Sequence, residues 1–144
     1  MLPRVRQAIR TLQGVDWVTV PKTETRIHKP RLTAVQKRQL ARLDELERLE
    51  CDWDDEGAPP MEPKATANVR SLIMTKGGAL LSDWVIFPAL NGTYQLQAKH
   101  REAVISVGNE DYSYVFHTSN RDEMVSNEKL NINTLGQLIE RINA

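Results

Sequence analysis

The strongest constraint on the fold lies in residues 84–99, where two strand-like segments flank Asn91-Gly92. Asn-Gly is typical of a type I′ hairpin turn, because both central positions of that turn need positive φ. The returning segment alternates in character, with Tyr94, Leu96 and Ala98 against Thr93, Gln95, Gln97 and Lys99. One face in the core and one in water is typical of an antiparallel sheet. Pro88 places the first strand, 84–89, at an edge or at its own end.

Further strands are expected at 103–107 and 112–117, after polar turns at 99–102 and 108–111. This gives a meander of about four strands. Tyr112, Tyr114 and Phe116 share one face of the last strand, and we interpret them as core residues rather than as a stacking platform for bases. Residues 118–129 are polar and predict an exposed loop, and residues 130–132 predict a short strand.

Three segments have helical periodicity. In the first, Thr33 and Gln36 form a capping-box pattern, and a single stripe collects Leu32, Val35, Leu43, Leu46 and Leu49. Asp44 and Arg48 stand at the i,i+4 spacing of a stabilising ion pair. The same stripe would also serve a helix pair in a dimer, so a homodimer is a further expectation.

The second helix is expected to begin at Pro63 and to end at Gly77-Gly78. Its apolar positions follow the helical period, at Ala65, Val69, Leu72 and Ile73. A final helix is expected to start near Asn133 or Thr134, with Leu135, Leu138, Ile139 and Ile142 on one side.

These patterns predict an α+β fold: an antiparallel meander of three to five strands packed against two or three helices on one face, with a basic N-terminal arm. Residues 31–144 are expected to form a single domain, and residues 1–30 a basic arm or small appended element. No apolar run is long enough to span a bilayer, and one cysteine cannot form an internal disulfide. We therefore expect a cytoplasmic protein with no membrane contact.

Between the first two helices lies a distinctive loop, residues 51–60, called the Trp53 loop below. Gly57 permits positive φ, Pro59 and Pro60 stiffen the chain, and Trp53 has the size to pin the loop onto the core. Its acids can accept hydrogen bonds from turn amides. Three interpretations stay open: a structural connector, a partner-binding loop, and a metal or catalytic carboxylate site.

Charge is segregated along a chain whose net charge is zero. Residues 1–42 hold ten Lys and Arg against two Asp and Glu, whereas residues 44–62 hold nine acids and one Arg. This asymmetry predicts electrostatic steering of a partner. The expected partner-binding surface, called the acidic surface below, comprises Asp44, Glu45, Asp52, Trp53, Asp54, Asp55 and Glu56. The alternative is nucleic-acid binding by the basic third of the chain, through Lys22, Arg26, Lys29, Arg31, Lys37 and Arg38.

No recognisable chemistry emerges from residue spacing. The histidines at 28, 100 and 117 are dispersed, and the lone Cys51 excludes a structural zinc ribbon. Prolines occupy the second half of the calcium-loop pattern that Asp52, Asp54 and Glu56 would begin. We expect no catalytic residues, no metal site and no cofactor, and therefore a protein that is not an enzyme.

Trp53-Asp54, Gly57-Ala58 and Pro59 resemble the W-D-G-x-G-A-x-P pattern of small uncharacterised bacterial proteins, which are often encoded on mobile elements and prophages. Residues 86–96 are similar to the hairpin that follows in that family, so the likeness covers about residues 40–117; Asp55 departs from the family's usual glycine. The resemblance implies an accessory role. The function expected is a non-enzymatic protein-binding module, an inhibitor, antitoxin or immunity-type protein, acting on a partner with a basic surface.

Overall fold

The computed structural model describes residues 31–144, except for the side chains of residues 76–78. The chain divides into two units, 1–31 and 32–144, and the predicted basic arm lies outside the described residues. The second unit contains, in chain order, α1 (Ala34–Glu47), α2 (Pro63–Met74), the 3₁₀ helix η3 (Thr75–Leu81), β2 (Trp84–Pro88), β3 (Tyr94–Ala98), β4 (Glu102–Val107), β5 (Asp111–His117), β6 (Asp122–Lys129) and α3 (Ile132–Asn143).

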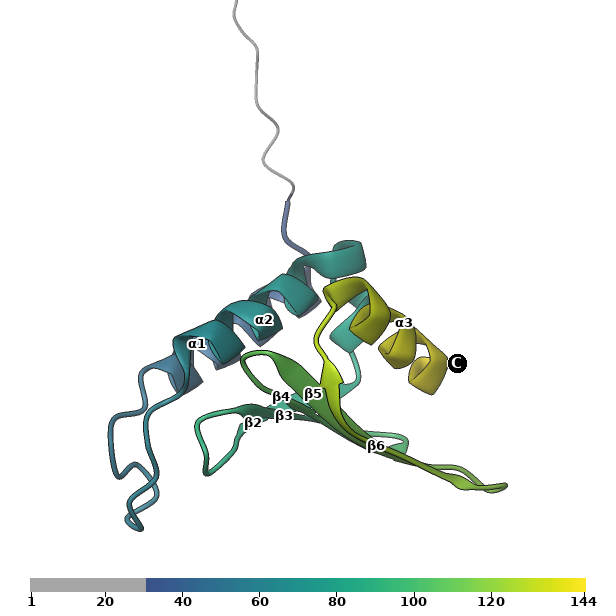
Figure 1. Ribbon diagram of the computed structural model, residues 1–144. Coiled ribbons are helices and arrows are strands. Elements are labelled where there is room, and N and C mark those ends of the chain that lie inside the picture. The colour runs from purple at the N-terminus through teal and green to yellow at the C-terminus, as the bar shows by residue number, and fades with distance from the viewer. Residues whose placement is uncertain (1–30) are drawn as a thin grey trace, which may run out of the picture. The chain divides into compact units, whose positions relative to one another are not determined.

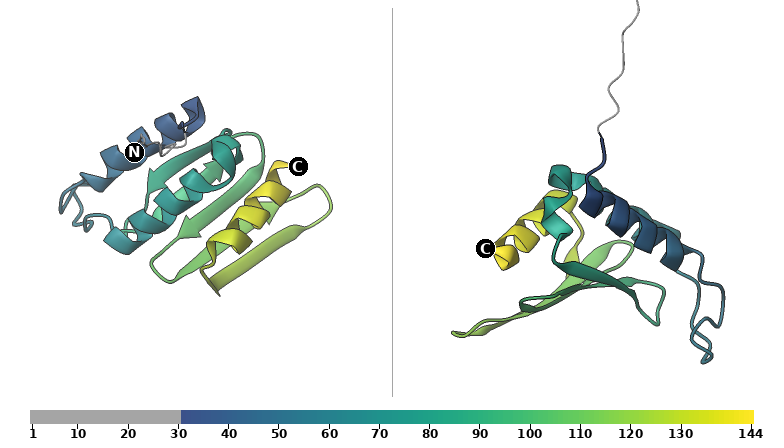
Figure 2. Two further views of the ribbon diagram at one scale, coloured as in Figure 1. Left: turned by 90° about the horizontal axis from the view of Figure 1, so that it is seen from above. Right: turned by 180° about the vertical axis from the view of Figure 1, so that it is seen from behind.

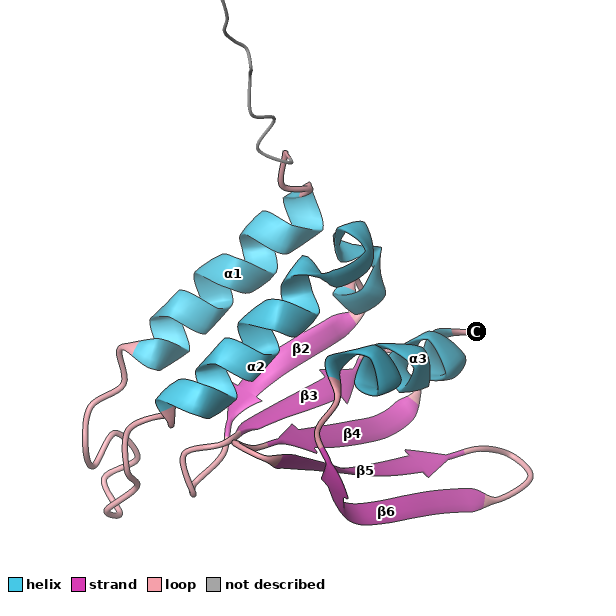
Figure 3. Cartoon of the chain, turned by 45° about the horizontal axis from the view of Figure 1, so that its top comes forward, coloured by secondary structure: helices cyan, strands magenta, loops and turns pink. Residues whose placement is uncertain are grey.

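The strands form one antiparallel sheet in the order β2-β3-β4-β5-β6, and the helices lie on one of its faces (Figures 1 and 3). The predicted α+β fold, with a meander of three to five strands and helices on one face, is confirmed. Registers such as Leu96 opposite Ile105 and Tyr94 opposite Val107 align the apolar residues of neighbouring strands on the helical side. The second face carries no helix in the described part of the chain (Figure 1).

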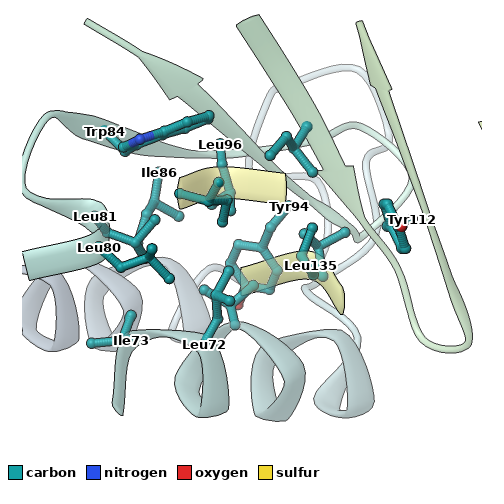
Figure 4. Packing of buried hydrophobic residues seen from close by; sticks show 14 of the residues in the cluster. Leu72, Ile73, Leu80, Leu81, Trp84, Ile86, Tyr94, Leu96, Tyr112 and Leu135 are labelled. Atoms are coloured by element: carbon teal, nitrogen blue, oxygen red, sulfur yellow. The ribbon is translucent and has the colours of Figure 1, made fainter. Parts of the chain in front are cut away.

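The core lies between that sheet face and the helices, as Figure 4 shows for Leu72, Trp84, Tyr94 and Leu135. Tyr94 is fully buried, and its hydroxyl lies 2.7 Å from the Thr66 hydroxyl, which satisfies the polar end of the ring. The aromatic row of β5 also belongs to this core, because Tyr112 and Phe116 are buried and Tyr114 packs against them in part. The prediction of a core role for this row is confirmed.

The β2–β3 hairpin is present, but its turn differs from the predicted type I′. Gly92 has φ of +86°, whereas Asn91 does not have positive φ. The amide of Gly92 donates to the Ala89 carbonyl over 3.1 Å, and the amide of Ala89 donates to the Thr93 carbonyl over 2.8 Å. The connection is therefore a three-residue loop with glycine in the left-handed position, which is the next commonest hairpin type.

Residues 118–129 are not the loop that their polarity predicts. Residues 122–129 form β6, which pairs with β5 and contains a bulge near Asn127, whose φ is +54°. The short strand expected at 130–132 is also wrong, because Asn131 caps α3 and Ile132 begins it. The Asn131 side chain accepts from the Thr134 amide over 3.2 Å, which places the helix start slightly earlier than predicted.

The capping box at Thr33 and Gln36 is confirmed, with reciprocal bonds of 2.9 and 3.1 Å. The buried face of α1, however, begins with two glutamines rather than with leucine. Gln36 donates to the Ile73 carbonyl over 3.3 Å, and Gln39 donates to the Leu81 and Trp84 carbonyls over 2.8 and 2.9 Å. Only Leu43 and Leu46 of the predicted stripe are fully buried.

Two local predictions about the helices are wrong. Asp44 contacts Arg70 of α2 rather than Arg48 of its own helix, because the two helices lie side by side. Helix α2 does begin at Pro63, but it ends at Met74, and the chain continues into η3 through Gly77-Gly78.

Candidate functional site

The Trp53 loop connects α1 to α2 and extends beyond the end of α1, toward the turn of the β2–β3 hairpin (Figures 1 and 3). The Glu62 amide donates to the Gly92 carbonyl over 2.8 Å. The approach is so close that a Cβ on Gly92 would lie 3.0 Å from the Pro60 carbonyl oxygen. The hairpin turn therefore fixes the position of the chain at the end of the loop.

Two of the predicted contact acids are turned inward to hold the loop backbone. Asp52 accepts from the Gly57 amide over 2.6 Å, and its own amide donates to the Ala58 carbonyl over 2.7 Å. Asp54 accepts from the amides of Ala58 and Glu56 over 2.9 and 3.0 Å. These bonds, the one from Ala58 foremost, favour the charged form and lower the pKa of Asp54. Both carboxylates therefore act as structural acceptors.

The loop backbone has an uncommon conformation. Asp52 and Asp55 adopt positive φ of 68° and 63°, and Gly57 has φ of 88°. Aspartate tolerates the left-handed region better than most residues, because its short side chain bonds locally. The sequence predicted the positive φ at Gly57 but not at the two aspartates.

Trp53 does not pin the loop onto the core, as its size predicted. The ring is half-buried and is absent from the core cluster, and its Nε1 donates to the Pro59 carbonyl over 2.8 Å. Met61 makes the core contact of this connector instead. Tryptophan fulfils its single donor within the loop, so it braces the two arms of the loop against each other.

The α1 portion of the acidic surface is engaged in ion pairs. Arg70 lies 3.2 Å from Asp44 and 3.1 Å from Glu47, and Arg42 lies 3.2 Å from Glu45. All of these side chains are at least a third exposed. Exposed pairs contribute little to stability, but they do neutralise the charge that Asp44 and Glu45 would offer to a partner.

Asp55 and Glu56 are different, since both are exposed and neither side chain has a partner in the part of the chain that the structure describes. They are adjacent in sequence, at the end of a loop whose backbone is held by Asp52 and Asp54. The predicted surface of seven residues is thereby divided into two neutralised helix acids, three bracing residues and two free carboxylates.

The residues predicted for nucleic-acid binding are divided as well. Lys22, Arg26 and Lys29 lie outside the described residues. Arg31 and Lys37 are exposed, and Arg38 donates from Nη2 to the Ser82 carbonyl over 3.0 Å. Arg38 is therefore used in part to attach α1 to the segment that precedes β2.

Within residues 31–144, no group of three or more His, Cys, Asp and Glu side chains is placed to hold a metal ion. No helix of the described region is long and apolar enough to cross a membrane. A cavity of about 390 Å³ lies between α3 and β5 and is lined by Tyr112, Tyr114, Thr134, Gln137, Leu138 and Arg141. Its only charged group, Arg141, is 2.9 Å from Glu123, and this contact lowers the pKa of the carboxylate.

In comparisons with known proteins, no family model, no curated protein and no solved structure matches the chain.

Proposed function

We propose that the protein is a non-catalytic protein-binding module of the inhibitor, antitoxin or immunity type, and that Asp55 and Glu56 contact a basic surface of its partner. The observation that carries the proposal is that the acidic side chains of the loop have two different roles. Asp52 and Asp54 hold the backbone, while the two carboxylates beside them are exposed without a counter-ion among the described residues.

A loop that is ordered before binding loses less conformational entropy when a partner docks. Here the order comes from side-chain hydrogen bonds of 2.6 to 3.0 Å and from the bond between Trp53 and Pro59. Strained backbone positions persist only where the surrounding structure enforces them, and they gather at functional sites. The positive φ of Asp52 and Asp55 supports a functional role for the loop on that ground.

The chemistry of the exposed end selects the kind of partner. Two adjacent carboxylates with no cation paired to them among residues 31–144 favour lysine and arginine on the opposing surface, and Trp53 of the same loop adds a half-exposed aromatic ring. Charges at the rim of an interface act mainly on the association rate and on its salt dependence. The partner is thus a protein with a basic patch, and the interaction weakens as ionic strength rises.

The test is capture from extracts of the native host with the full chain and with Asp55→Lys/Glu56→Lys. Asp54 stays unchanged, because its loss would release the loop backbone and confuse two effects. The matched control, Asp83→Lys/Glu102→Lys, makes the same change of net charge at two exposed acids outside the loop. Circular dichroism verifies that all three proteins are folded.

We expect the original protein and the control to recover the same partner and the loop variant to lose it. With the recovered partner purified, the loop variant should show an association rate at least tenfold lower at low salt, by the loss of steering. Equal recovery by the loop variant would place the binding site elsewhere. If both variants failed to recover the partner, the loss would be explained by the change of net charge alone, and this result would also contradict the proposal.

A further inference from the structure

The two edge strands of the sheet, β2 and β6, differ in whether another element covers their outward backbone groups. On the β2 edge, Gln39 of α1 donates to the Trp84 carbonyl over 2.9 Å, and Arg42 of α1 donates from Nε to the Ile86 carbonyl over 3.1 Å. Figure 2 shows α1 running alongside this end of the sheet. A further strand cannot pair there without displacing the helix, so this edge is protected in the way that natural sheets usually are.

The opposite edge, β6, ends the described sheet with no element beside it. The Thr118 amide donates to the Arg121 carbonyl over 2.9 Å, which closes the β5–β6 hairpin with a hydrogen-bonded pair. Such pairs alternate along an antiparallel ladder, so Glu123 and Val125 direct their backbone groups to β5. Asp122 and Met124 therefore direct their amides and carbonyls away from the sheet, and Ser126 lies at the start of the bulge, beyond the regular ladder.

We propose that β6 is the contact surface for a second copy of this chain, paired antiparallel about a two-fold axis at Met124. In this register Met124 lies opposite Met124 of the second copy, and Asp122 lies opposite Ser126. Met124 presents outward backbone groups in both copies, so the central pair exchanges both N–H···O bonds. A two-fold contact of this kind closes after two copies and leaves no β6 edge exposed.

Charge favours this register over its neighbour. An axis at Val125 would place Asp122 opposite Glu128 and Arg121 opposite Lys129, and like charges directly opposite one another destabilise a sheet. An axis at Met124 creates no like-charge pair. It is also centred on residues 122–125, whose register with β5 is regular, and leaves the bulge at Ser126 and Asn127 at the margin of the contact.

The side chain of Met124 supports the same axis. It is 71% exposed, and it lies on the sheet face that carries no helix, in register with Val115. Val115 is in turn opposite Val104, so an apolar row crosses this face and ends at Met124. Pairing about Met124 joins that row to the same row of the second copy. The strand contact is short by the standard of stable complexes, so we expect a dimer at micromolar rather than nanomolar concentration.

The first test is sedimentation equilibrium of the full chain from about 10 µM to 1 mM, because weak dimers lie in this range. We expect the original protein to dimerise, and Met124→Pro to lower the association constant at least tenfold. Proline removes an amide that faces away from β5, a position at which edge strands tolerate it. The control, Met124→Ala, keeps that amide and should retain the dimer. A monomer at every concentration, or a dimer unaffected by Met124→Pro, would overturn the proposal.

A second test does not depend on how the proline variant folds. In a Cys51→Ser background, Met124→Cys places two thiols at a hydrogen-bonded pair, where Cα atoms lie about 5.5 Å apart, within the range that a disulfide spans. Ser126→Cys, on the same face of the same strand, lies opposite Asp122 rather than itself. We expect rapid oxidative cross-linking of the first variant alone. Equal cross-linking of both, or none of Met124→Cys, would refute the register and with it the proposed interface.

Discussion

Substitution of Gly92 by alanine measures how tightly the Trp53 loop is tied to the hairpin. Gly92 has φ of +86°, and its missing Cβ would lie 3.0 Å from the Pro60 carbonyl oxygen and 3.3 Å from Glu62 Cγ. The left-handed conformation alone costs alanine about 1–2 kcal/mol. Crowding against backbone adds roughly 1–3 kcal/mol, as overpacked sites do. We therefore expect Gly92→Ala to lower the free energy of unfolding by about 2–5 kcal/mol.

Gly57 offers a matched control within the same region. Its φ is +88°, and a Cβ there would meet nothing within 4 Å. Gly57→Ala thus shares the conformational penalty of Gly92→Ala, and it shares the smaller gain that alanine brings by restricting the unfolded chain. Only the contact with Pro60 and Glu62 differs between the two variants. The difference between their free energies of unfolding isolates that contact.

Urea unfolding followed by circular dichroism gives both free energies, provided that the slope of the free energy of unfolding against urea concentration is the same in the two variants. We expect Gly92→Ala to be less stable than Gly57→Ala by at least about 1 kcal/mol, which corresponds to a difference of roughly 4 °C or more in Tm. Equal stability of the two variants would show that the loop moves away from the hairpin at no cost. The close packing of loop and turn would then have no energetic weight.

Four further substitutions test other parts of the fold. Gln39→Leu leaves two buried carbonyls without a donor, so we expect a loss of about 2–4 kcal/mol in urea unfolding. Gln36→Leu leaves one carbonyl, bonded over a longer 3.3 Å, without a donor and the exposed Thr33 amide without an acceptor, so we expect a smaller loss. Asn109→Ala removes the acceptor for an amide in the first turn of α2, and calorimetry should show a loss of about 1 kcal/mol. The hydrogen bond that the protonated His117 ring donates to the Asp122 carboxylate raises the pKa of His117, so its stabilising effect is full below about pH 6.5 and is lost as the pH rises through the raised pKa. NMR titration should show that Asp122→Asn returns the pKa toward its ordinary value; an unchanged pKa would contradict the assigned cause.

The parts of the fold that were predictable are those whose signal is local. A capping box needs only two residues that are three apart in sequence, and Thr33 and Gln36 make both of its hydrogen bonds. The buried face of α2 and the alternation of β3 arise because each element covers a core on one side only. The turn of the β2–β3 hairpin was misassigned because Asn-Gly fits both a two-residue loop and the glycine position of a three-residue loop.

The missed features depend on distant partners. Only Glu123 and Val125 of β6 are partly buried, and one of them is charged, so eight mostly exposed positions look like a loop. Gln36 and Gln39 are buried because carbonyls of Ile73, Leu81 and Trp84 meet them. A polar residue in an otherwise apolar stripe is the only sequence signal that could have suggested such a role.

The candidate site shows the same division. Composition indicated that residues 51–60 were unusual and acidic, and their position between two helices was correct. It could not assign roles to individual acids, because Asp54 and Asp55 are chemically identical and differ only in whether a backbone amide lies within reach. Trp53 was expected in the core because of its area, yet a short loop that closes on Pro59 satisfies its donor first.

The acidic loop and the proposed dimer edge are spatially separate. The chain just after the loop is bonded to the β2–β3 turn through Glu62, and β6 is the strand farthest from β2 in the sheet. A two-fold axis at β6 consequently leaves both Asp55-Glu56 pairs free, at the two ends of a continuous sheet. A dimer then binds a densely immobilised partner more tightly than one copy does, through effective concentration. Met124→Pro should weaken that binding and leave binding to a monovalent partner in solution unchanged, whereas Asp55→Lys/Glu56→Lys should weaken both. If Met124→Pro abolished monovalent binding, the two surfaces would not be independent.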